Sequence, residues 1–245
     1  GQYMEELYIE NKIRVDKFIH VGSLNLANFL KTEKHNLSKK KFDICLISDE
    51  GAYLDKYGPK QIQLDDIKKI ELNFFKLIKW TILLCKKNKL KFNFAFKRKK
   101  ENVVFSDIEK ERLSNNLTND EYSFLLENCS FPSNEEPQVS YKNLFQSKIG
   151  VCVSSTLLWE AIGCGNKILS CNFTGLELFD FPIEGMCSLK ECDYETFEKR
   201  VLKILEIDAR EYFESLSVDK NYLISECEPD KVIGLIRNEI NKNLT

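Results

Sequence analysis

The sequence predicts an α/β protein whose core is a doubly wound parallel sheet. Residues 42–48 form a continuous apolar run without regular alternation, which is typical of a central parallel strand, and residues 149–153 form an apolar run of strand length. Residues 90–96 are the third expected strand. Helical segments separate these runs, and residues 149–171 have the pattern of a strand, a short helix and a returning strand. Repeated units of this kind wind into one open sheet.

The elements outside these three strands follow from apolar periodicity and from helix stop signals. Residues 1–36 are expected to form a connecting segment instead of a domain, with a short strand ending at Gly22 and a helix over 25–30. The helix predicted over 65–87 has apolar residues on more than one stripe and is therefore expected to be largely buried. The remaining expected elements are a loop at 51–58, a helix at 119–127, a helix from Thr156 to a stop at Gly165, a strand at 167–171, a loop at 174–185, helices at 194–206 and 209–216, and a last helix at 229–240.

Composition limits the classes of function. The net charge is −2, with Lys and Arg spread among acidic residues, so the chain lacks the basic footprint of a nucleic-acid-binding protein. Neither a secretory signal nor an 18-residue apolar span is present. Nine cysteines are scattered singly, most of them inside apolar runs. This predicts reduced cysteines in the core of a cytoplasmic protein.

Three hydroxyl residues, Ser154, Ser155 and Thr156, lie where the strand 149–153 ends and the next helix begins. A helix N-terminus exposes backbone N–H groups and a partial positive charge, which suits a phosphate. Hydroxyl groups there can donate further hydrogen bonds to a bound anion. The alternative is that Ser154 or Ser155 is only an N-cap.

Glu160 lies one helical turn after Thr156. The apolar positions expected to face the sheet are Leu157, Leu158, Ala161 and Ile162. Thr156 and Glu160 then share the opposite face, because residues four apart are neighbours on a helix. A carboxylate one turn from a phosphate site can accept hydrogen bonds from ribose hydroxyls, whereas the alternative is a solvated surface residue.

An acidic pair, Asp49 and Glu50, follows directly on the strand 42–48 and precedes Gly51. In a parallel sheet it lies at the same edge as the hydroxyl cluster, where ligands bind. A carboxylate there can bind an acceptor hydroxyl, act as a general base, or attack an anomeric carbon. Strand alternation lets only one of the two point into the cleft, and Asp49 is favoured because its shorter side chain is better fixed. The alternative is turn chemistry with Gly51.

A basic pair, Lys97 and Arg98, follows the strand 90–96 at the same edge. Beside the hydroxyl cluster it can neutralise a monophosphate or a diphosphate. The alternative is a solvated loop over residues 97–100.

The pattern Ser-Ser-Thr-x-x-x-Glu-Ala-x-x-x-Gly-x-Lys-Ile, which starts at Ser154, resembles the donor-binding segment of GT-B glycosyltransferases. Together with Asp49-Glu50-Gly51 it is most similar to bacterial surface-carbohydrate enzymes, including the sialyltransferase and Kdo-transferase groups. Those groups share an acidic motif, a His-Pro motif and a paired Ser/Thr motif. The resemblance covers about residues 40–205, and the His-Pro motif is absent because the histidines are His20 and His35.

The resemblance implies a Rossmann-like C-terminal domain of GT-B type over residues 37–245, with residues 1–36 as a linker or the tail of an N-terminal domain. It also implies a metal-independent glycosyltransferase without a cofactor, acting in the cytoplasm or peripherally at the inner face of the membrane. Such an enzyme moves a sugar from a nucleotide-sugar donor to a glycan or glycolipid acceptor, in the synthesis of a surface polysaccharide, a capsule or a lipopolysaccharide.

By the same resemblance, the Ser/Thr cluster and the basic pair contact the donor phosphate, Glu160 contacts the ribose, and Asp49 or Glu50 contacts the acceptor or the reacting carbon. Two alternative functions belong to classes other than glycosyltransferases. A CDP-polyol phosphotransferase on the same scaffold relies on histidines near the phosphates, and no histidine follows His35. A non-catalytic nucleotide-binding or partner-binding module agrees with the absent His-Pro motif.

Overall fold

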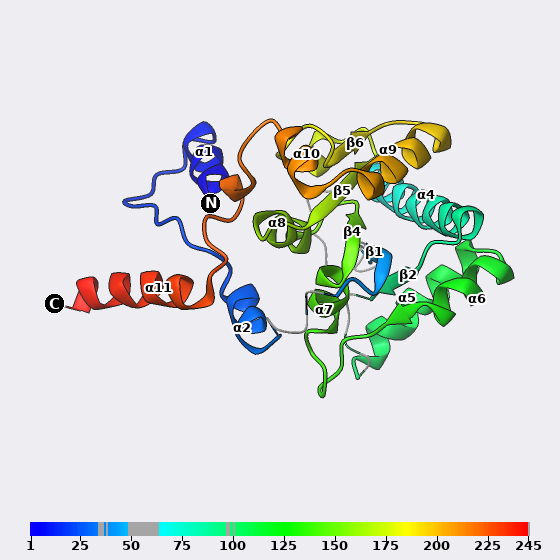
Figure 1. Cartoon of the computed structure of the whole chain (residues 1–245), viewed down its shortest axis with the longest axis horizontal. Helices are drawn as coiled ribbons and strands as arrows, with labels where there is room; N and C mark the ends of the chain where they lie inside the picture. Colours follow the sequence, from blue (N-terminus) through cyan, green and yellow to red (C-terminus); the bar gives the residue numbers. More distant parts are fainter. Residues whose placement is uncertain (34–36, 38, 49–63, 97–98, 100, 245) are drawn as a thin grey trace.

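The parallel sheet has the strand order β3-β2-β1-β4-β5-β6, and each neighbouring pair runs parallel. These are the strands of the computed structural model, which describes residues 1–33, 37, 39–48, 64–96, 99 and 101–244. Their bounds are β1 Phe42–Ile47, β2 Phe92–Ala95, β3 Cys129–Ser130, β4 Ser147–Cys152, β5 Lys167–Asn172 and β6 Ser188–Lys190. Helices flank the sheet (Figure 1), and the predicted α/β class with a Rossmann-like doubly wound sheet is confirmed.

The helices agree with the sequence prediction where apolar periodicity or capping signals are strong. For example, α6 begins after a capping box in which the Thr118 hydroxyl and the Glu121 carboxylate each bind the other's backbone N–H. The bounds are α1 Gln2–Glu10, α2 Leu24–Glu33, α4 Leu64–Asn88, α5 Val103–Asn116, α6 Asn119–Glu127, α7 Val139–Phe145, α8 Thr156–Gly163, α9 Tyr194–Glu206, α10 Ala209–Glu214 and α11 Pro229–Leu244, with 3₁₀ turns η2 Glu177–Phe179 and η3 Lys220–Tyr222.

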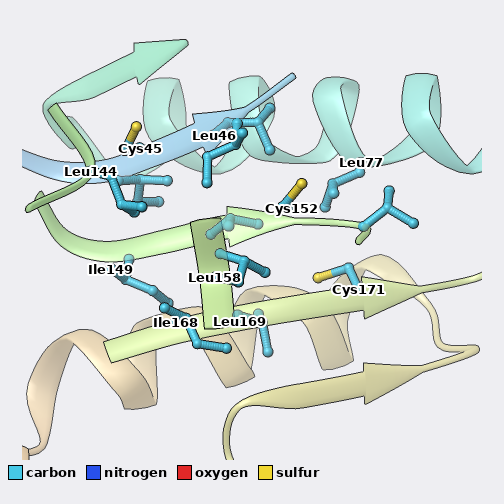
Figure 2. Close-up of a cluster of buried hydrophobic side chains, with 14 of the residues drawn as sticks. Cys45, Leu46, Leu77, Leu144, Ile149, Cys152, Leu158, Ile168, Leu169 and Cys171 are labelled. Atoms are coloured by element: carbon cyan, nitrogen blue, oxygen red, sulfur yellow. The ribbon is translucent and has the colours of Figure 1, made fainter. Parts of the chain in front are cut away.

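The hydrophobic core lies where helices cover the central strands. Figure 2 shows side chains of β1, β4 and β5 meeting those of α4 and α8. Ile44 of β1, Ile149 of β4 and Ile168 of β5 are fully buried. Central parallel strands are covered on both faces, which explains why their sequences are continuously apolar instead of alternating.

Several elements differ from the sequence prediction. The short strand expected over residues 13–23 is absent from this described segment, which is irregular up to the start of α2. The helices α1, α5 and α7 and the edge strands β3 and β6 were not predicted. The edge strands are only two and three residues long, so their sequences carry too little pattern to indicate a strand.

The N-terminal and C-terminal helices gather at one end of the molecule, where α11 packs against α2 (Figure 1). The helix α4 buries Leu77 and Ile78 but leaves Leu72 and Leu83 at least half exposed, so it is amphipathic and less buried than expected. Within the described part of the chain, no helix combines the length and the apolar composition that crossing a membrane requires.

Candidate functional site

The order of the sheet changes direction between β1 and β4. The chain passes from β1 outward to β2 and β3, and later from β4 outward to β5 and β6. The two inner strands are paired in parallel, with Leu46 opposite Val151, so their carboxyl ends lie side by side. A crevice forms outside the carboxyl ends of the strands at such a switch point, and open α/β sheets bind their ligands there.

The hydroxyl cluster lies at this switch point. Ser155 has extended backbone geometry and is the N-cap of α8, because its Oγ accepts a hydrogen bond from the Leu157 N–H at 3.3 Å. Thr156 is exposed in the first turn of the helix, and Ser154 is half-buried beside it. The capping alternative therefore holds for Ser155. Its hydroxyl oxygen accepts this bond, and the hydroxyl proton can still be donated to an anion.

The turn between β4 and α8 is fixed from the neighbouring strand. The Oγ of Ser170, in β5, donates a hydrogen bond to the Val153 carbonyl at 2.7 Å. Ser170 is buried, so the bond forms where water does not compete with it. This bond holds the chain in place directly before the hydroxyl cluster.

Glu160 lies on α8 but does not face solvent. The residue is only 7% exposed, its Oε2 accepts a hydrogen bond from the Tyr141 hydroxyl at 2.8 Å, and Ser23 is a further hydrogen-bond partner of the carboxyl group. The Tyr141 ring stacks on Phe29 of α2, with 5.3 Å between ring centroids. The alternative of a solvated surface glutamate is therefore wrong, and Glu160 connects α8 to α7 and to the N-terminal segment.

Burial raises the pKa of Glu160, since the loss of solvation disfavours its charged form more than Ser23 and Tyr141 favour it. Below its ordinary value of 4.5 the carboxyl group is protonated in both the folded and the unfolded chain. As pH rises above that value, the unfolded chain releases the proton first, and the free energy of unfolding decreases until pH passes the raised folded pKa.

Glu160→Gln should remove this contribution to the pH dependence of the free energy of unfolding. We expect the variant to gain stability relative to the wild type as pH rises from 4.5, by about 1.4 kcal/mol for each unit by which the folded pKa is raised. Urea unfolding at a series of pH values measures the difference, and Glu177→Gln, which changes an exposed carboxylate, is the matched control. A difference between Glu160→Gln and the wild type that is constant with pH would contradict the prediction.

The acidic pair Asp49 and Glu50 and the basic pair Lys97 and Arg98 lie outside the described residues. Their roles therefore stay predictions. The strand ends that precede them are described: the Ser48 N–H donates to the Ala95 carbonyl at 2.9 Å, and the Phe96 N–H donates to the Ser130 carbonyl at 2.9 Å. The parallel pairing of β1, β2 and β3 thus continues to the carboxyl edge of the sheet.

A second buried carboxylate at this edge was missed by sequence reasoning. Glu109, on α5, is 2% exposed and accepts a hydrogen bond from the Ser48 hydroxyl at the end of β1. The helix that carries it has no clear apolar stripe, so periodicity did not reveal either the helix or its buried face. Several other charged residues surround Glu109 in the sequence, and nothing in the sequence distinguishes it from them.

Neither possible metal ligands among the described residues nor similarity to known proteins identifies further residues of the site. Among the described residues, no group of three or more His, Cys, Asp and Glu side chains could hold a metal ion. Comparison of the sequence with protein-family models and with curated proteins finds no match. The arguments for function therefore come from the fold and from the residues at the carboxyl edge of the sheet.

Proposed function

We propose that this protein binds a nucleotide-activated sugar at the carboxyl edge of the sheet, between β1 and β4, and transfers the sugar to a glycan or glycolipid acceptor. The observation that carries the proposal is the coincidence of two features. The strand order changes direction between β1 and β4, and the hydroxyl-rich start of α8 lies at that same point. Doubly wound sheets bind nucleotides at such points, with the phosphates at the helix N-terminus.

The donor phosphate is the first element of the proposed complex. Ser154 and Thr156 donate hydroxyl hydrogen bonds to it, and the backbone N–H groups of the first turn of α8 add partial positive charge. Lys97 and Arg98 supply the full positive charge that a phosphate leaving group requires. With this charge from side chains and the helix, the transfer proceeds without a metal ion.

The ribose and the acceptor complete the proposed complex. Glu160 accepts hydrogen bonds from the ribose hydroxyls by exchanging a present donor, Tyr141 or Ser23, for the sugar. Asp49, with Glu50 as the alternate, acts on the acceptor hydroxyl or on the reacting carbon. The acceptor is a growing surface polysaccharide or lipopolysaccharide, and the protein meets it from the cytoplasm, at most peripherally at the membrane.

Calorimetric titration with CMP, UDP, GDP and CDP tests the proposal. We expect one of these nucleotides to bind, and we expect Thr156→Val to weaken its binding about 10-fold, because a hydrogen bond to a charged group is lost. Thr196→Val is the matched control, since Thr196 is also an exposed threonine in the first turn of a helix, α9, that does not start at the switch point.

Three outcomes separate the candidate functions. If a well-folded protein binds none of the four nucleotides, the proposal is wrong. If a nucleotide binds but its sugar donor is neither transferred nor hydrolysed, the protein is a non-catalytic binding module. If a CDP-polyol donor is consumed in place of a sugar donor, the phosphotransferase alternative holds.

A further inference from the structure

Two cysteines far apart in the sequence meet at the end of α8 that is opposite the hydroxyl cluster. Cys164 is the C-cap of α8, and Cys227 lies just before α11. Each thiol is close enough to the other to be the main influence on its pKa, and Gly163, beside Cys164, packs against Ile224, three residues before Cys227. Both are half-buried and line a cavity of about 680 Å³, to which Lys220, Glu226 and other side chains also contribute. The pair is therefore within reach of small molecules from solvent.

Close backbone packing holds the Cys227 segment in place. A Cβ added to Gly163, next to Cys164, would lie 2.9 Å from the Cβ of Ile224, so α8 and this segment approach each other as only a glycine allows. On the other side, a Cβ on Gly22 would lie 1.9 Å from the Glu226 carbonyl oxygen. The segment that carries Cys227 is thus enclosed between α8 and the chain that leads into α2.

Local hydrogen bonds fix the two cysteines further. The Glu226 Oε1 accepts hydrogen bonds from the backbone N–H groups of Cys227 and Glu228 at 2.9 and 2.8 Å. The Cys164 N–H donates to the Glu160 carbonyl at 3.1 Å. Both thiols are therefore attached to backbone that is itself held, and their contact does not depend on flexible segments.

The electrostatic surroundings favour a thiolate at Cys227. The neighbouring Cys164 thiol, together with the ammonium group of Lys220, lowers the pKa of Cys227 against the opposing effects of burial, Glu226 and Glu160. The other half-buried thiols, Cys129 and Cys192, differ, because burial raises the pKa of each. A thiolate is the form that reacts with oxidants.

We propose that Cys164 and Cys227 form a redox-active dithiol that a peroxide converts into a disulfide linking α8 to the segment before α11. The Cys227 thiolate attacks one peroxide oxygen, the O–O bond breaks, and a sulfenic acid and hydroxide form. The Cys164 sulfur then attacks the Cys227 sulfur and displaces the hydroxyl group as water, with its thiol proton passing to that water. In sum, two thiols are oxidised by two electrons and one hydrogen peroxide is reduced to two waters. The inference does not depend on nucleotide binding.

Treatment of the native protein with hydrogen peroxide, followed by alkylation and peptide mapping, tests the proposal. We expect two fewer alkylated thiols than the nine of the reduced chain, a peptide cross-link between Cys164 and Cys227, and recovery of both thiols after reduction. Cys164→Ser should abolish the cross-link and leave a sulfenic acid on Cys227 that dimedone traps. Cys192→Ser, at another half-buried thiol, should leave the cross-link intact.

A measurement on the unaltered chain keeps the test independent of how well the variants fold. In the reduced native protein, iodoacetamide should label Cys227 faster than Cys129 or Cys192, because the pKa of Cys227 is lowered whereas burial raises the pKa of the other two thiols. Equal labelling rates, no cross-link under native conditions, or a cross-link between another pair would each overturn the proposal.

Discussion

Asp49→Asn is expected to lower the rate of sugar transfer about 100-fold or more, while nucleotide affinity stays within a few-fold of the wild type. The amide keeps the shape of the side chain but cannot take a proton from the acceptor hydroxyl, and loss of a general base reduces turnover by this order. Affinity for the donor is retained because the phosphate contacts are proposed to come from other residues. Steady-state transfer rates, together with calorimetric nucleotide titration, measure the two effects separately.

Glu50→Gln is the matched control, because it makes the same chemical change at the neighbouring position. If Asp49 is the catalytic residue, Glu50→Gln should keep most of the transfer rate. If Glu50 is the catalytic residue instead, Glu50→Gln should lower the transfer rate and Asp49→Asn should keep most of it. A loss of stability without a specific loss of rate would indicate that the pair only forms the turn with Gly51. Near-normal transfer by both variants would show that the reaction does not use this pair, and the chain would then contribute donor binding alone.

Leu158→Ala is expected to lower the free energy of unfolding by about 2–5 kcal/mol. Leu158 is fully buried on α8, and Figure 2 shows it among Ile149, Ile168 and Leu169 on the neighbouring strands. Its removal leaves a cavity under the helix whose first turn carries the hydroxyl cluster, and the surrounding core relaxes only partly. Urea unfolding measures the loss.

Leu72→Ala controls for the change of residue type within a helix. Leu72 lies on α4 and is 70% exposed, so truncating its side chain removes little buried apolar area. We expect a change within about 0.5 kcal/mol, as for most surface substitutions. Equal losses for the two variants would contradict the packing assigned to α8.

The sequence by itself determined the central strands and the strongest helices. The runs that became β1, β4 and β5 are continuously apolar because both faces of a central parallel strand are buried, and this pattern is visible without the structure. The helix α6 was predictable from local signals, since its capping box is formed by residues only three apart, Thr118 and Glu121. The position of the hydroxyl cluster at the start of α8 was also predictable, because it follows from the change from strand to helix within one short segment.

Tertiary structure alone decided the strand order and the environment of single polar residues. The switch point exists only because β1 pairs with both β2 and β4, and pairing between distant segments leaves no local pattern. The burial of Glu160 depends on Tyr141 and Ser23, and the burial of Glu109 depends on Ser48. The contact of Cys164 with Cys227 likewise requires the chain to return to α8. A local sequence fixes backbone preference and apolar pattern, whereas the solvation and the partners of a side chain are set by segments that only folding brings together.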